Sequence, residues 1–416
     1  MRPRSYFALA TCTVLSIPAC SIPHQDSEVA SRSDEIVDVP QTPVERQSIG
    51  NCWLYAEAAW VESMHLSATG ESFTASESYW TYWHWFDQIA EDDATEVQTG
   101  GWEATAHRII TMRGLVRQAD FVLADNGVEM STQQKKALDA VNAELRSGRL
   151  STASARADRK LVRSVLDKAW GLPTATRTWL DTAFGDDASR TLDDGAEIEG
   201  TPILSPAAFR VRYTERTASS RPSVPKDTNL SQAIRDWHSE QYPSSATNRR
   251  NFMIRVQRAL HDRQPVVLSW AVDFNALEQS TNARRGSFNM TTLGASGGPG
   301  HQGGHMVVLE DYQAMTQNFG LLAAGTTLDP NQAADRAKLE AALLPSTTVQ
   351  FLRVKNSWGT VRADRSSVPG FPGYHDLYMD YLNGPIAWCP DAEDPSPATC
   401  RGRTVPLWTV MMPPGY

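Results

Sequence analysis

The chain has 416 residues, of which 41% are hydrophobic and 21% are charged. These are ordinary values for a globular protein, so they exclude a largely disordered chain. The net charge of -9 and the isoelectric point near 5.5 exclude the broad basic surface with which proteins hold nucleic acid. No internal apolar run reaches the roughly 18 residues of a membrane-spanning helix. The length fits two or three domains, or one large domain with insertions.

The first twenty residues predict an export signal. Arg2 and Arg4 form a basic start, and residues 6–18 are mostly apolar or small but too short for a stable membrane anchor. The segment ends Ile17-Pro18-Ala19-Cys20, which resembles a bacterial lipoprotein signal, with Pro18 as a departure. We therefore expect an exported lipoprotein of the cell envelope that is anchored by a lipid on Cys20. An ordinary secretory signal, giving a periplasmic or secreted protein, is the alternative.

The next segments predict a tether followed by buried helices. Residues 21–45 are polar and lack periodicity, which is typical of a flexible tether. Residues 52–66 are apolar nearly all round, so they predict a buried helix. Residues 76–90 predict a second, aromatic helix, and a further helical stretch follows Gly100-Gly101.

The second half of the chain changes from helices to strands. Residues 115–235 are charged and predict a helical insertion. The segments 265–272, 305–309 and 349–355 are rich in Val, Leu and Phe at strand length. Helices that precede strands in this way predict the α+β class, with a helical half and a half built on a sheet or barrel.

The five cysteines fall into distinct groups. With an export signal, we expect Cys12 to leave with the signal and Cys20 to carry the lipid. Cys389 and Cys400 lie in a stretch rich in Pro and Asp, and an oxidising compartment would let them close a disulfide loop. A metal site is less favoured, because no second Cys or His pair lies nearby at ligand spacing. Cys52 is left unpaired, which makes it either a reactive thiol or a buried core thiol.

Three residues fit one kind of chemistry. Cys52 begins a predicted helix, where the macrodipole favours the thiolate. His305 begins an apolar strand, and Asn356 ends another just before an aromatic residue and a turn. A cysteine nucleophile needs a base, and the base needs a group that orients its second ring nitrogen. Together these residues predict nucleophilic catalysis, with His301 in the glycine-rich loop 294–304 as a rival base.

Several motifs resemble the papain-like cysteine peptidases, and most closely their bleomycin hydrolase (aminopeptidase C) branch. The motifs are Gly50-Asn51-Cys52-Trp53, residues 77–87, Gly100-Gly101-Trp102, residues 205–209, Gly303-Gly304-His305 and Asn356-Ser357-Trp358-Gly359. The match runs over roughly residues 42–385. The resemblance implies a two-lobed fold over 46–385, with a helical lobe that carries the nucleophile, a barrel-like sheet lobe and the helical insertion. Residues 386–416 would then be a C-terminal extension that holds the disulfide loop.

The same resemblance implies a role for each site residue. Cys52 would attack as a thiolate, His305 would hold its proton in an ion pair, and Asn356 would fix the imidazole tautomer. Gln47 would form the oxyanion hole with the Cys52 N–H, although it stands one position nearer to Cys52 than in the family. The expected cleft residues are Trp53, Gly100, Gly101, Gly304 and Trp358, the last of which covers the His–Asn bond.

The predicted function is therefore hydrolysis of peptide bonds through an acyl-enzyme, without metal or organic cofactor. The partner would be a peptide or protein substrate, with no nucleic acid and with membrane contact only through the lipid. A catalytically weak papain-like lipoprotein that binds peptides or proteins is the alternative, and acyl transfer to an amine would use the same triad. Whether the chain trims ends or cuts internally stays open, as does its oligomeric state.

Overall fold

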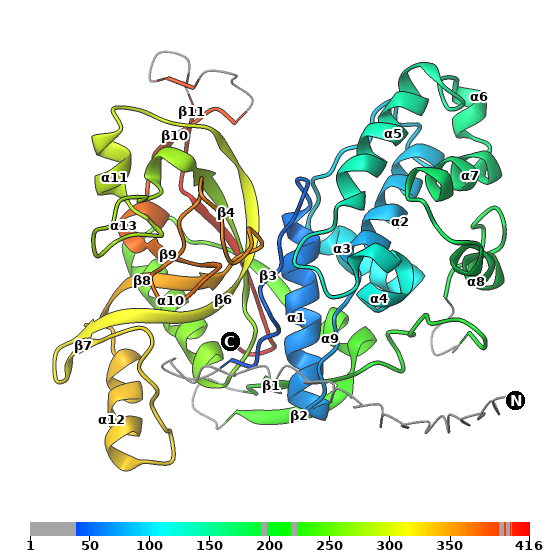
Figure 1. Ribbon diagram of the computed structural model, residues 1–416. Coiled ribbons are helices and arrows are strands. Elements are labelled where there is room, and N and C mark those ends of the chain that lie inside the picture. Colours follow the sequence, from blue (N-terminus) through cyan, green and yellow to red (C-terminus); the bar gives the residue numbers. More distant parts are fainter. Residues whose placement is uncertain (1–38, 193–197, 218–222, 391–394, 397–399, 401) are drawn as a thin grey trace, which may run out of the picture. The chain divides into compact units, whose positions relative to one another are not determined.

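The computed structural model describes residues 39–192, 198–217, 223–390, 395–396, 400 and 402–416, which all belong to one compact unit. They form a helical half (residues 52–237) and a sheet half (residues 238–416), each with its own hydrophobic core (Figure 1). Helices and a mixed sheet confirm the α+β class. The export signal and Cys20 lie outside the described residues.

The helical half is built around one buried helix. Helix α1 (Cys52–Thr69) lies between the other helices and the sheet, and its first thirteen residues are all buried (Figure 1). It ends at Gly70, whose left-handed φ of 74° lets its N–H cap the carbonyl of Leu66. The helices around it are α2 (Glu77–Ala90), α3 (Glu103–Arg113), α4 (Gln118–Phe121), α5 (Gln133–Ser147), α6 (Ala153–Arg156), α7 (Arg159–Ala169) and α8 (Thr174–Phe184), with the 3-10 turn η1 (Leu123–Asp125). The predicted aromatic helix is α2, where Tyr79, Trp83 and Phe86 are buried.

The predicted helical insertion 115–235 also contains a β-hairpin. Strands β1 (Arg210–Glu215) and β2 (Val224–Asn229) pair antiparallel, and helix α9 (Leu230–Asp236) follows them. Val211 and Tyr213 alternate with exposed residues and turn inward onto the helical core. The prediction of helix alone was therefore wrong for this part.

The sheet half is organised by one sheet of eight strands. Its order is β3-β12-β4-β6-β8-β9-β5, with β7 beside β6, and all of its pairs are antiparallel except β5 with β9. The strands are β3 (His238–Gln241), β4 (Val267–Asp273), β5 (Ser287–Phe288), β6 (Gln302–Thr316), β7 (Gly320–Leu322), β8 (Thr348–Lys355), β9 (Tyr374–Tyr378) and β12 (Leu407–Met412). The other elements are α10 (Ala246–His261), η2 (Phe274–Ala276), α11 (Met290–Ala295), α12 (Ala333–Ala342), α13 (Met379–Leu382) and the hairpin β10 (Ile386–Trp388) with β11 (Gly402–Thr404).

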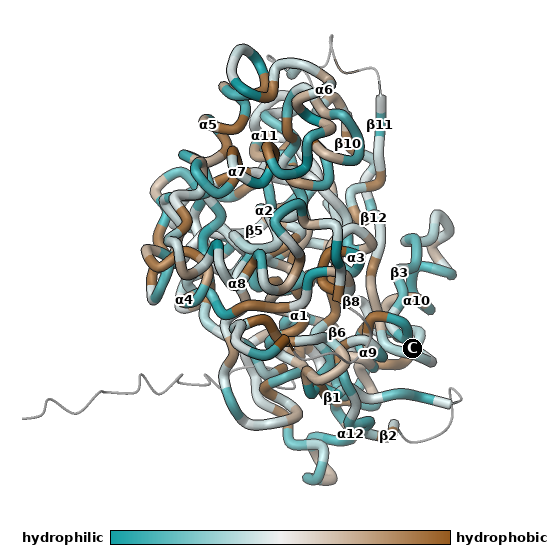
Figure 2. The backbone as a smooth tube through the Cα atoms, turned by 90° about the vertical axis from the view of Figure 1, so that its right-hand side faces the viewer, coloured by the Kyte–Doolittle hydropathy of each residue, from teal (hydrophilic) through white to brown (hydrophobic). Residues whose placement is uncertain are grey.

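Strand β6 joins the two cores. Its side chains alternate, so Met306 and Val308 pack into the helical core while Val307 and Leu309 pack into the sheet core. In Figure 2, hydrophobic stretches lie around α1 and β6 in the interior, whereas surface loops are mostly hydrophilic. The start of β6, which carries His305, is therefore held against α1.

Two predicted domain boundaries are wrong. Residues 39–45 of the predicted tether are packed on the body, because Val39 is buried in the sheet core and Thr42 is buried between both halves. Residues 386–416 are not an appended extension, because β12 lies between β3 and β4 inside the main sheet. The chain ends at Tyr416, which is buried in the sheet core and whose carbonyl accepts a hydrogen bond from Arg255.

No helix in the described part of the chain is long and apolar enough to cross a bilayer.

Candidate active site

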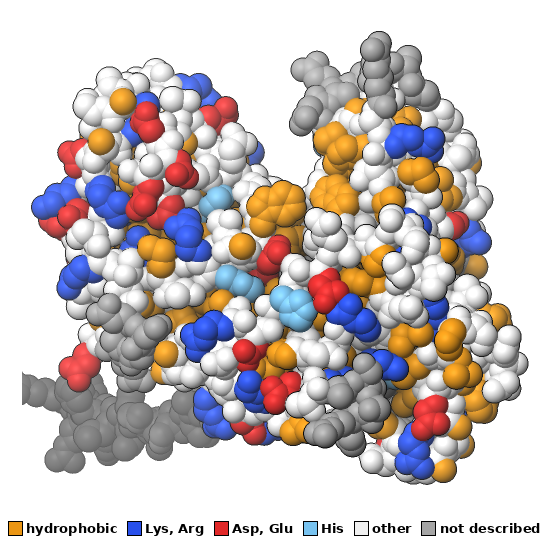
Figure 3. Space-filling model, turned by 180° about the vertical axis from the view of Figure 1, so that it is seen from behind, with side chains coloured by type: hydrophobic (Ala, Val, Ile, Leu, Met, Phe, Trp, Pro, Cys, Tyr) orange, Lys and Arg blue, Asp and Glu red, His pale blue; other side chains and the backbone are white. Residues whose placement is uncertain are grey.

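A pocket of about 510 Å³ lies where the start of α1 meets the start of β6. Figure 3 shows the groove between the two halves, with hydrophobic side chains on both of its walls. Cys52 and His305 line this pocket from opposite halves. Of the predicted cleft residues, the pocket lining includes Trp53, Gly100, Gly101 and Gly304. The volume falls in the range of about 300–1,000 Å³ that is typical of small-molecule sites.

His305 is held in one orientation by its strand, by a hydrogen bond and by a stacked ring. It pairs with Trp270 across β4 and β6 and is 6% exposed. Its Nε2 lies 2.8 Å from Asn356 Oδ1, so Nε2 carries the hydrogen and donates it to the amide oxygen. The Trp358 ring stacks on the imidazole at 4.8 Å between centroids and 24° between planes. Nδ1 is then the nitrogen left to accept a proton.

Cys52 is the first residue of α1 and is 8% exposed. Burial raises the pKa of its thiol to about 11, although the backbone N–H groups of Met306, Trp53 and Cys52 itself act to lower it. Burial also lowers the pKa of His305 to about 4. The effect of burial on the Cys52 pKa therefore outweighs the opposite effect of the helix N-terminus. Burial favours a neutral thiol and a neutral imidazole over the predicted ion pair.

Asn356 is fixed from both ends of its side chain. Its Oδ1 accepts from His305 and also from the backbone N–H of Ser357 at 2.8 Å. Its Nδ2 lies 3.3 Å from Nδ1 of His375, a histidine that is 1% exposed and whose pKa burial lowers to about 3. A neutral His375 can accept from the amide, which fixes which end of Asn356 faces His305. None of the sequence motifs indicated His375.

We expect His375→Leu to lower kcat for peptide hydrolysis by about tenfold or more, with little change in KM. The reason is that Asn356 loses the acceptor that holds its amide in one orientation. His375→Gln keeps an acceptor and should recover part of the rate. Steady-state kinetics of the two variants checks this, and equal losses of kcat in both would contradict a positioning role.

Gln47 and His301 are not among the residues that line the pocket. Gln47 Nε2 donates to the Ile49 carbonyl at 2.7 Å, and its Oε1 accepts from Ser357 Oγ at 2.6 Å. His301 is exposed, and its ring is parallel to that of Phe274 with 6.2 Å between centroids. Neither side chain lines the pocket that Cys52 and His305 share.

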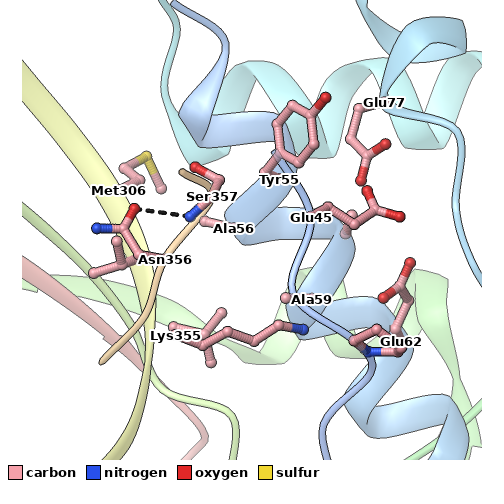
Figure 4. Close-up of a pocket in the computed structure, with 14 residues that line it drawn as sticks. Glu45, Tyr55, Ala56, Ala59, Glu62, Glu77, Met306, Lys355, Asn356 and Ser357 are labelled. Carbon is pink, nitrogen blue, oxygen red and sulfur yellow. Dashed lines mark hydrogen bonds between the residues drawn. The ribbon is translucent and has the colours of Figure 1, made fainter. Parts of the chain in front are cut away.

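A second, smaller cavity of about 30 Å³ lies between α1 and strands β6 and β8, and Met306 lines both cavities. That volume holds about two water molecules. Figure 4 shows Glu45, Glu62 and Glu77 on one side of it and Lys355 reaching towards them from β8. Lys355 directly precedes Asn356, so this charged cluster borders the candidate site.

Thr42 connects the charges of this cluster. Lys355 Nζ donates to Thr42 Oγ1 at 3.0 Å, and that hydroxyl donates to Glu62, which also accepts from the backbone N–H of Ala75. Burial raises the pKa of Glu45 to about 8 and that of Glu77 well above its usual range, while burial lowers the pKa of Lys355. Burial also raises the pKa of Glu62, although the Lys355 ammonium acts to lower it. Burial therefore shifts these carboxyl groups towards their protonated forms, whereas Lys355 favours the charged form of Glu62.

Cys389 and Cys400 are joined by a disulfide. Among the described residues, no group of three or more His, Cys, Asp or Glu side chains could hold a metal ion. His84, which lies on α2, instead contacts the carbonyl of Gly100 at 3.1 Å.

Comparisons with known proteins leave the family of this chain undecided. No family model matches the chain, and no curated protein matches it. A crystal structure of PepW from Lactobacillus rhamnosis HN001 is similar with a TM-score of 0.42 and 11% sequence identity, over 91% of this chain and 81% of that chain. A likeness this weak carries no conclusion about function.

Proposed function

We propose that the protein is a cysteine peptidase of the papain-like type, with Cys52, His305 and Asn356 as its triad. The observation that supports it best is the buried His305–Asn356 hydrogen bond under the Trp358 ring. This bond leaves Nδ1 of His305 without its proton, in a pocket that Cys52 also lines. An oriented base beside a lone thiol is the minimum that nucleophilic catalysis requires.

In the proposed reaction, Cys52 Sγ attacks the peptide carbonyl carbon while its proton passes to His305 Nδ1. The tetrahedral intermediate then collapses, the C–N bond breaks, and the leaving amine takes that proton from His305. A thioester on Cys52 remains. Water attacks the thioester and gives a proton to Nδ1, and collapse releases the carboxylic acid as the proton returns to Cys52. Asn356 keeps Nε2 hydrogen-bonded throughout.

The oxyanion of this reaction would be held by the Cys52 N–H and by the second amide hydrogen of Gln47, since the first is donated to Ile49. We expect Gln47→Ala to lower kcat by about 10²- to 10³-fold, because one such donor acts mainly on the transition state. Kinetics of Gln47→Ala with Ser48→Ala as its neighbour control measures this. Unchanged kcat would remove Gln47 from the mechanism.

The pH dependence of kcat/KM follows from the neutral states of the Cys52 thiol and the His305 imidazole. His305 accepts a proton only when unprotonated, and its pKa is lowered to about 4. We therefore expect kcat/KM to fall as the pH is lowered through about 4, and to stay level up to neutral pH because the thiol transfers its proton during attack. A pH–rate profile on one uncharged peptide checks this. An acid limb near pH 6.5 would instead indicate an unperturbed imidazole.

The direct test of the proposed activity is incubation of the full chain with a mixed peptide library under reducing conditions, followed by mass spectrometry. We expect new peptide ends, whose positions separate trimming from internal cleavage. The Cys52→Ala chain, incubated in the same way, is the negative control. Identical peptide profiles for both chains between pH 5 and pH 8 would contradict the proposal.

A peptide-binding function without turnover is the second candidate. It is favoured by the Gln47 side chain, whose amide is already bonded to Ile49 and Ser357. We also propose export of the chain with lipid attachment at Cys20, which the disulfide Cys389–Cys400 supports, since disulfides persist in oxidising compartments. Mass analysis of the membrane-bound protein for a lipidated N-terminal cysteine tests this.

A further inference from the structure

Indole rings flank both candidate catalytic residues of the pocket. On the helical side, Trp53 follows Cys52, and its ring lies so close to Gly101 that a Cβ there would come within 2.5 Å of it. On the sheet side, a Cβ on Gly304, the residue before His305, would come within 3.0 Å of the Trp408 ring. Both glycines thus let an indole lie against the backbone, so each wall is aromatic next to the reacting groups.

The C-terminal segment completes the sheet-side wall. Trp388 and Pro390 line the pocket, and the Trp388 ring contacts Trp408 edge to face at 5.5 Å. Gln302 holds this segment in place, because its Nε2 donates to the Ala387 carbonyl at 2.8 Å and its Oε1 accepts from the Cys389 N–H at 2.7 Å. The wall is therefore fixed to the strand that carries His305.

Gln302 is itself held in place. Its Nε2 also donates to Asp273 at 2.8 Å, and Asp273 accepts from the backbone N–H groups of Gly300 and Asn275. Gln302 is buried at 4% exposure and Asp273 at 0%. The aromatic wall therefore has a rigid support that exists before any ligand enters.

The described residues that line the pocket include no Asp, Glu, Lys or Arg. Its polar side chains are largely occupied within the protein, since Ser269 bonds Thr409 at 2.6 Å and His84 contacts Gly100. Trp102 also lines the pocket, and 60% of its surface is exposed. A charged side chain of a bound peptide would find no ionic partner among these residues. An apolar side chain of the peptide would instead contact the aromatic rings of both walls.

We propose that this pocket selects peptides with a large aromatic side chain next to the bond to be cleaved, through Trp408 and Trp388. The inference rests on the proposed function, because it names the substrate class of that same site. It assigns the C-terminal segment 386–390 and β12 a role in specificity. The expected order of preference is aromatic, then large aliphatic, then small or charged side chains.

Binding to the full chain with Cys52→Ala tests the pocket without requiring turnover. The probes are the blocked peptides acetyl-Ala-Ala-X-Ala-Ala-amide, with X as Phe, Leu, Gly, Asp or Lys, measured by isothermal titration. We expect the Phe peptide to bind about tenfold or more tightly than the Gly peptide, as burial of an aromatic ring requires. Adding Trp408→Leu or Trp388→Leu should reduce that ratio by about threefold or more.

The control is Phe319→Leu, because Phe319 is 43% exposed and lies between β6 and β7, away from the pocket lining. It should leave the ratio unchanged. Equal affinities for the Phe and Gly peptides would overturn the inference. So would an affinity ratio of these two peptides that neither Trp408→Leu nor Trp388→Leu changes. Tight binding of the Phe peptide without cleavage of any peptide by the unmodified chain would support the pocket and contradict the peptidase proposal.

Discussion

Replacing Cys52 with Ala should abolish peptide hydrolysis, with a fall of at least about 10⁴-fold in kcat/KM. Cys52 is the sole free cysteine among the described residues and lies at the α1 end of the pocket. Removing its sulfur removes the only proposed nucleophile, so no acyl-enzyme can form. The change takes away one buried atom and leaves the α1 backbone as it is. Peptide cleavage measured beside circular dichroism separates loss of chemistry from loss of fold.

Two histidines make a matched pair for the same test. His305→Gln should lower kcat/KM nearly as much as Cys52→Ala does, because the effects of replacing residues that act as one catalytic unit are not additive. His301→Gln changes the same residue type four positions earlier, on an exposed site, and should keep most of the activity. A large loss in His301→Gln with a small one in His305→Gln would reverse the assignment of the base. If Cys52→Ala keeps an activity close to that of the unmodified chain, Cys52 is not the nucleophile.

Replacing Lys355 with Met should destabilise the fold by about 3–5 kcal/mol, because it leaves the buried Glu62 carboxylate without the cation that favours its charged form. Lys355 is 7% exposed, and its ammonium reaches Glu62 through Thr42. These residues join the segment before Cys52, helix α1 and strand β8. Chemical denaturation measures the loss. Adding Glu62→Gln to Lys355→Met should restore part of the stability, since it removes the unpaired charge.

The control for that loss is a surface ion pair of the same kind. Lys338 contacts Asp335 at 2.8 Å, with both side chains partly exposed, so Lys338→Met should cost less than about 1 kcal/mol. Equal effects of the two lysine changes would contradict a charged, paired Lys355.

The same cluster has a pH signature. The pKa of Glu45 rises from 4.5 to about 8 on folding, so the folded chain keeps a proton that the unfolded chain loses. The stability that this group contributes is therefore full below about pH 4.5 and decreases as the pH rises towards 8. Denaturation of Glu45→Gln beside the unmodified chain should show a shallower fall over that interval.

Local patterns predicted much of the fold. Helix α1 and strand β8 follow from the apolar character of residues 52–66 and 349–355. The hairpin β1–β2 was missed because its second strand is short, charged and interrupted by Pro225. The place of β12 between β3 and β4 was missed because strand pairing between distant segments leaves no local signal.

The candidate site divides in a similar way. The motifs around Cys52, His305 and Asn356 predicted residues that the fold does place around one pocket and its supporting hydrogen bond. His375 could have been found only from the register of β8 and β9, in which it pairs with Val354, two positions before Asn356. The ion pair was expected from the family resemblance and the thiolate from the helix terminus. Burial of both groups, which opposes their charged forms, follows from packing that the sequence does not display.

Trapping the acyl-enzyme tests most directly whether Cys52 is the nucleophile. The full chain is mixed with the p-nitrophenyl esters of acetyl-phenylalanine and of acetyl-glycine, quenched in acid, digested and analysed by mass spectrometry. We expect an acyl group on the peptide that contains Cys52, which is lost in Cys52→Ala and strongly reduced in His305→Gln. An adduct on another residue, or none on Cys52 while the esters are hydrolysed, would contradict it.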